Sequence, residues 1–100
     1  MRTIVTARHC EISDELRAKA ETIMEKFVKL ASRPLSAEVI FDADHGEKVV
    51  ELKLSLPRGQ VKVAKAEAVS FRSALDRAAD KIRRQLDKEE RRSTHRSTVE

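Results

Sequence analysis

Apolar residues recur along this 100-residue chain at two different spacings, and the points where the spacing changes define its elements. Residues 3–8 alternate β-branched and other side chains, which is typical of a short strand. Over residues 14–30 apolar side chains recur in steps of three and four, which indicates an amphipathic helix of about five turns. Alternation then returns up to residue 66, before a second helical stretch. The predicted order is therefore strand, helix, three strands, helix.

Local signals place the boundaries of these elements. Ser13 and Ser70 precede the two helical stretches, where a serine hydroxyl can accept hydrogen bonds from the first backbone N–H groups. Pro34 ends the first helix, because the residue before a proline is kept out of helical geometry. Residues 44–46 and 57–59 each contain a glycine and are expected to form turns. We predict strands over residues 3–8, 35–42, 48–56 and 60–66.

This order of elements predicts an α+β two-layer sandwich. A helix that joins two strands makes them parallel neighbours with a right-handed crossover, whereas tight turns make the following strands antiparallel. Each helix has one apolar face, so we expect both helices to pack on one face of a four-stranded mixed sheet. A single domain is expected over residues 1–92. The helical spacing of apolar residues does not extend into residues 93–100, which are predicted to be a mobile C-terminal tail.

Positive charge is concentrated in the second half of the chain. Residues 57–100 carry twelve Lys and Arg against seven Asp and Glu, whereas residues 1–56 are close to neutral. On the second helix a basic row falls within one stripe at helical spacing: Arg77, Lys81, Arg84, Lys88 and Arg91. A weaker row flanks the apolar stripe of the first helix: Lys19, Lys26, Lys29 and Arg33. Side-by-side packing of the helices would join the two rows into one surface suited to phosphates, unless they are only solvated, ion-paired faces.

The chain lacks the residues that several other classes of function need. Cys10 is the only cysteine, and its neighbour His9 has no obvious third group with which to form a catalytic or metal site. The three Phe all fit core positions and there is no Tyr or Trp, so stacking of bases on an exposed sheet is not expected. No apolar run is long enough to cross a membrane. We expect a cytoplasmic protein that is not an enzyme, with no cofactor, metal or small-molecule substrate.

Several short motifs, taken in order, give the chain a family resemblance. It resembles the ribosome hibernation-promoting factors and ribosome-associated translation inhibitors, over residues 1–92. The most specific match lies in the second helix and is similar to the family pattern A-I-D…K-L…R-Q-L-x-K. The matching segments are Glu11-Ile12-Ser13, Leu16-Arg17, Lys26-Phe27, Val50-Glu51-Leu52, Ala64, Ala74-Leu75-Asp76, Lys81-Ile82 and Arg84-Gln85-Leu86-Asp87-Lys88.

The resemblance implies a short-form hibernation factor that binds rRNA of the small ribosomal subunit where mRNA and tRNA would lie. Translation would then stop in stationary phase or stress, and the protein would be a monomer off the ribosome. By this resemblance the phosphate-binding residues are Lys26, Lys29, Arg77, Lys81, Arg84, Lys88 and Arg91. Two alternatives stay open: a general binder of double-stranded RNA, and an adaptor that docks an acidic protein.

Overall fold

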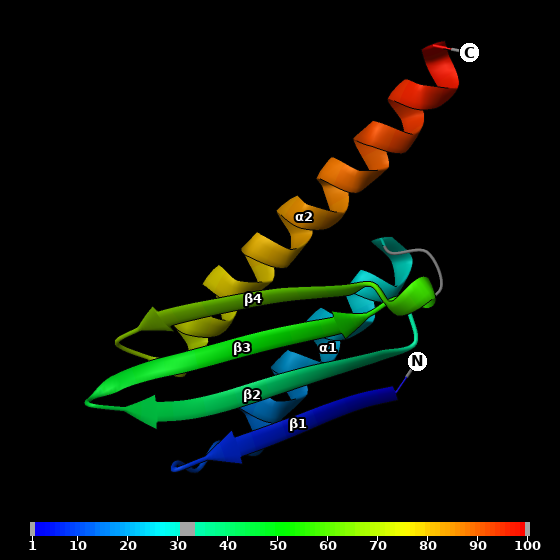
Figure 1. The fold of residues 1–100 in the computed structure, drawn as a ribbon. Helices are drawn as coiled ribbons and strands as arrows, with labels where there is room; N and C mark the ends of the chain where they lie inside the picture. The colour runs from blue at the N-terminus through cyan, green and yellow to red at the C-terminus, as the bar shows by residue number, and fades with distance from the viewer. Residues whose placement is uncertain (1, 31–33, 100) are drawn as a thin grey trace.

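The computed structural model of the chain describes residues 2–30 and 34–99, with side chains described for these residues except 28, 30 and 88–99. Its strands and helices follow one another in the predicted order (Figure 1). They are β1 (Arg2–Arg8), α1 (Asp14–Leu30), β2 (Ser36–Asp44), β3 (Glu47–Ser55), the 3-10 turn η1 (Pro57–Gly59), β4 (Val61–Ala68) and α2 (Phe71–Val99).

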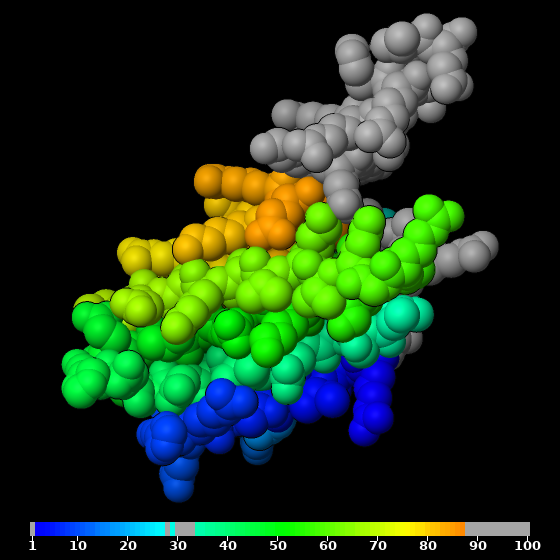
Figure 2. All heavy atoms as spheres, viewed as in Figure 1, coloured from blue at the N-terminus to red at the C-terminus, as the bar shows by residue number. Residues whose placement is uncertain are grey.

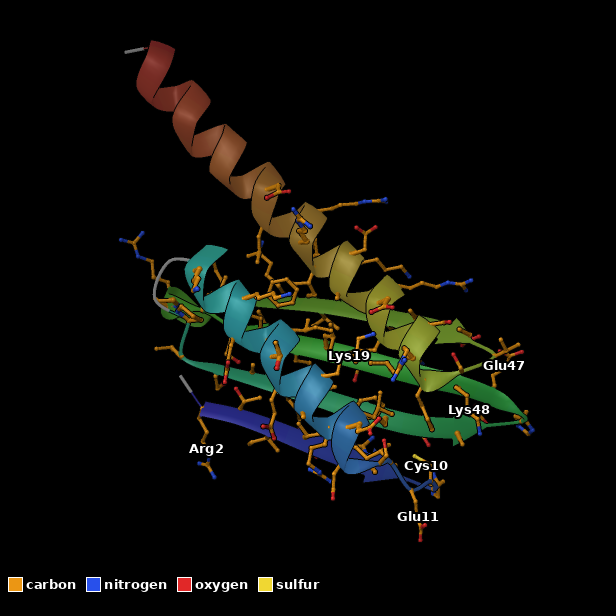
Figure 3. All side chains as sticks on the ribbon, turned by 180° about the vertical axis from the view of Figure 1, so that it is seen from behind. Arg2, Cys10, Glu11, Lys19, Glu47 and Lys48 are labelled. Atoms are coloured by element: carbon orange, nitrogen blue, oxygen red, sulfur yellow. The ribbon has the colours of Figure 1, made fainter. Side chains whose placement is uncertain are left out.

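The four strands form one mixed sheet in the order β1-β2-β3-β4. β1 pairs with β2 in parallel, and the β2–β3 and β3–β4 pairs are antiparallel. Both helices lie on the same face of this sheet, behind it in Figure 1 and in front of it in Figure 3. The opposite face is the one seen in Figure 2. The predicted α+β sandwich is confirmed.

The core lies between the sheet and the helices. In β3 the side chains of Val50, Leu52 and Leu54 are fully buried, as the alternation along this strand predicts. Phe41 of β2 is also fully buried and meets the ring of Phe71 edge to face, with 5.5 Å between ring centroids. The helices contribute Ala20, Met24, Phe27, Ala74, Leu75, Ala78, Ile82 and Leu86.

The expected serine caps begin both helices. Ser13 Oγ accepts a hydrogen bond from the Leu16 N–H at 3.1 Å, and Ser70 Oγ accepts one from the Ser73 N–H at 3.2 Å. The β2–β3 turn is tighter than expected, because Asp44 still pairs with Glu47 across the hairpin. His45 and Gly46, with φ of 49° and 84°, make a two-residue turn of the kind that favours positive φ at both positions.

The second helix is longer than the sequence pattern indicated. α2 continues through Val99, so most of the segment 93–100, which is predicted above to be a tail, has a helical backbone. The apolar period stops at Leu86, but no glycine or proline follows Gly59 to end a helix. Among the described residues, none of the helices combines the length and apolar character needed to span a lipid bilayer.

We expect Phe41→Ala to lower the free energy of unfolding by about 3–5 kcal/mol, because it leaves a cavity in the core and removes the ring contact with Phe71. Chemical denaturation monitored by circular dichroism measures the change. Val61→Ala is the matched control, since the Val61 side chain is 53% exposed, and its effect should stay within about 0.5 kcal/mol. Equal effects of the two substitutions would contradict this assignment of the core.

Candidate nucleic-acid interface

One flank of α2 faces the free edge of β4. Arg77 Nη1 donates a hydrogen bond to the Glu67 carbonyl oxygen at 3.0 Å, and Lys81 Nζ donates to the Lys65 carbonyl oxygen at 2.7 Å. Gln85, one turn further along, donates from Nε2 to the Val63 carbonyl oxygen at 3.1 Å. Two members of the predicted basic row are therefore already bound to the sheet.

Another flank of α2 faces α1. Lys19 Nζ of α1 lies 3.0 Å from Asp76 Oδ1 of α2, so the flank of α2 that carries Asp76 is turned toward the first helix. Asp80 also pairs within α2, with its Oδ2 2.9 Å from Arg84 Nη2. Both pairs are at least partly exposed to solvent, so each contributes little stability. The exposed Arg84 can therefore still meet another anion.

The two basic rows do not merge into one surface, although side-by-side packing of the helices was expected to join them. On α2 the basic row lies toward β4, because Arg77 and Lys81 reach the β4 carbonyls. The flank that carries Asp76 lies between this row and α1. Helical periodicity places Asp80 near that same flank. The two predicted basic rows are thus separated by carboxylates.

Four exposed cations on the helices have no ion-pair or hydrogen-bond partner among the described residues: Lys26, Lys29, Arg72 and Arg83. Arg83 was not among the predicted site residues. It follows Asp76 by seven residues, two helical turns, and therefore lies on the flank that faces α1. Lys26 follows Lys19 by the same interval, and α1 and α2 start from the same end of the sheet (Figure 3). A search for cations at seven-residue spacing would not have found Arg83, because positions 76 and 90 of the sequence are both acidic.

Part of the predicted site lies outside what is described. Lys88 and Arg91 belong to the backbone of α2, but their side chains are not among the described ones. Arg33, which was expected to extend the row on the first helix, also lies outside the described residues. The placed members of the predicted site are Lys26, Lys29, Arg77, Lys81 and Arg84.

Neither face of the domain presents a phenylalanine ring on which a base could stack. Phe27 and Phe41 are buried, and Phe71 is half-buried with Lys48 Nζ 5.3 Å from its ring centroid. The chain contains no Tyr or Trp. The arrangement therefore favours contacts to phosphates through lysine and arginine over stacking on bases.

His9 and Cys10 both contact residues of β2. His9 Nδ1 lies 3.1 Å from Asp42 Oδ1, and the Cys10 thiol donates to the Phe41 carbonyl oxygen at 3.5 Å. Partial burial raises the pKa of the Cys10 thiol, and the nearby Asp42 carboxylate raises it further. A raised pKa is the opposite of what an activated cysteine requires. The described part of the chain also holds no group of three or more side chains suited to bind a metal ion.

Comparison with known proteins gives matches along nearly the whole chain. The family model described as "Sigma 54 modulation protein / S30EA ribosomal protein" matches residues 3–94. A ribosome hibernation promoting factor from Pseudomonas putida is 32% identical over 91 residues, which cover 88% of this chain and 85% of that protein.

Two solved structures share the fold. A ribosomal subunit interface protein from Coxiella burnetii has a TM-score of 0.77 at 23% identity, covering 90% of this chain and 98% of that chain. The N-terminal domain of Protein Y from Thermus thermophilus also has a TM-score of 0.77, at 24% identity, covering 88% of this chain and 98% of that chain.

We expect iodoacetamide to alkylate Cys10 more slowly at pH 8 in the folded protein than in urea, because the raised pKa leaves less thiolate. The alkylation rate measured across a pH series should rise at a higher pH in the folded protein. A shift of the folded profile to lower pH would contradict this environment for Cys10, and a lower rate with an unshifted profile would show steric shielding alone.

Proposed function

Because the chain belongs to the sigma 54 modulation protein / S30EA ribosomal protein family, whose members are non-catalytic, ribosome-associated hibernation factors, we propose that it binds the small ribosomal subunit and inhibits translation. The observation that carries this proposal is the family match over residues 3–94. The exposed cations on the helices provide chemistry that fits it. Phosphate contacts need only positioned lysine and arginine side chains, without a nucleophile or a cofactor.

The proposed binding surface is the helical side of the domain. Lys26, Lys29 and Arg84 expose their charged groups there, and Arg83 joins them as a further cation. Arg77 and Lys81 keep free N–H donors after their carbonyl contacts, so both remain proposed phosphate ligands. Lys88 and Arg91 complete the proposed set, by their places in the α2 sequence.

Inhibition is proposed to work by occlusion. A domain seated on small-subunit rRNA at the mRNA and tRNA channel would block both ligands without any chemical step. Such a protein would act in the cytoplasm, in stationary phase or under stress. Support comes from the P. putida relative, which is called a ribosome hibernation promoting factor.

Co-sedimentation with 30S subunits and with 70S ribosomes across a salt series tests the proposal. We expect saturable, roughly stoichiometric binding to 30S subunits that tRNA competes away. Affinity should fall steeply with salt, because each phosphate contact releases condensed counterions. Equal binding to any duplex RNA would instead favour a general RNA binder. Absence of ribosome binding at every salt concentration, with capture by acidic proteins, would favour an adaptor.

We expect the double variant Arg84→Glu, Lys88→Glu to lower 30S affinity at least tenfold, because it replaces two proposed phosphate ligands with carboxylates. The matched control is Arg2→Glu, Lys65→Glu, which changes the net charge equally on the face of the sheet opposite the helices. Its affinity should change much less. Circular dichroism checks that both variants fold, and equal losses in the two would contradict the proposed surface.

A further inference from the structure

β4 is an edge strand that has the features needed to pair with another strand. It lies at the end of the sheet order, and its eight residues pair with β3 without interruption. It contains no proline or glycine, and Val61 and Val63 expose 53% and 44% of their surface. Regular edge strands of this kind present unpaired N–H and C=O groups to other chains.

The three donors from α2 occupy this edge. Glu67, Lys65 and Val63 are two residues apart along β4, and their carbonyl oxygens accept hydrogen bonds from Arg77, Lys81 and Gln85 respectively. Alternate carbonyls of a strand point to the same side, so these three point away from β3. The donors are four residues apart on α2, one per turn, and therefore follow the strand along one flank. We call these three side chains the edge ladder.

We propose that the edge ladder closes a latent pairing site, and that its removal lets β4 pair antiparallel with β4 of a second copy of this chain. The ladder takes the carbonyl acceptors that such a pair would need. It also places long side chains where the second strand would lie. This role is independent of any binding to the ribosome.

The sequence of β4 is complementary to itself in such a pair. In an antiparallel pair centred on Ala66, Lys65 of one copy lies opposite Glu67 of the other, and the reverse pair is equivalent. Opposite charges placed directly across two strands stabilise the pair. The carbonyls of Lys65 and Glu67 would then accept from the second copy in place of Lys81 and Arg77.

The test removes the ladder with the triple variant Arg77→Ala, Lys81→Ala, Gln85→Ala and measures self-association by sedimentation velocity. We expect dimerisation at least tenfold stronger than in the parent protein. Amide exchange followed by NMR should show the Lys65 and Glu67 N–H groups gaining protection as concentration rises. Protection at these sites distinguishes edge pairing from non-specific association.

The matched control is Arg72→Ala, Arg83→Ala. It removes the same charge from α2 without touching a β4 carbonyl, and it should associate no more than the parent does. Adding Lys65→Glu to the triple variant places two carboxylates opposite each other and should restore the monomer. A further Glu67→Lys exchanges the charges and should restore the dimer.

A folded triple variant that stays monomeric, or a dimer without protection at Lys65 and Glu67, would overturn the proposal. If the triple variant does not fold, Lys81→Met replaces it, because this substitution frees only the Lys65 carbonyl and keeps an apolar side chain of similar length. The same two readouts then apply. A dimer with protected Lys65 and Glu67 N–H groups supports the proposed pairing site on β4, and a monomer contradicts it.

Discussion

Burial of the inner face of the sheet beneath α1 and α2 is the interaction on which the rest of the structure depends. β2 and β3 supply large buried side chains such as Phe41 and Leu52, whereas the inner residues of β4 are Ala64, Ala66 and Ala68. Small residues let a helix approach a strand closely. α2 can therefore lie near enough to β4 for Arg77 and Lys81 to reach its carbonyl oxygens. The same packing that forms the core thus determines where the cations of α2 point.

The cations of the domain consequently differ in what they contact. Arg77 and Lys81 hold the edge of β4, and on α1 Arg17 Nη1 donates to the Val5 carbonyl oxygen of β1, the other edge strand. Both edges of the sheet are therefore contacted by arginines from the helices. Lys26, in contrast, has no such partner among the described residues. A polyanion would meet free charges at some positions and charges fixed by backbone carbonyls at others.

Most of the fold could be predicted from the sequence because it depends on local signals. Alternation in residues 48–56, the caps at Ser13 and Ser70 and the helix between the first two strands were sufficient to predict the mixed sheet and its helical layer. The end of α2 could not be predicted in this way, because neither a breaker nor an apolar residue marks it. The partners of Arg77 and Lys81 could not be predicted either. Helical periodicity shows which residues share a flank, but not whether that flank faces a strand edge, a second helix or solvent.

The distribution of charge also bears on how such a domain would meet RNA. On the face opposite the helices, Glu38 lies opposite Lys53, and Glu51 lies opposite Lys65, so acidic and basic side chains alternate there. Further carboxylates, from Asp44 and Glu47, stand at the tip of the β2–β3 hairpin. This face gives an approaching phosphate backbone little net attraction, whereas the helices expose cations without a carboxylate partner, such as Lys26 and Arg83. Because a protein without aromatic platforms relies on charge and shape, this asymmetry is what would orient it on RNA.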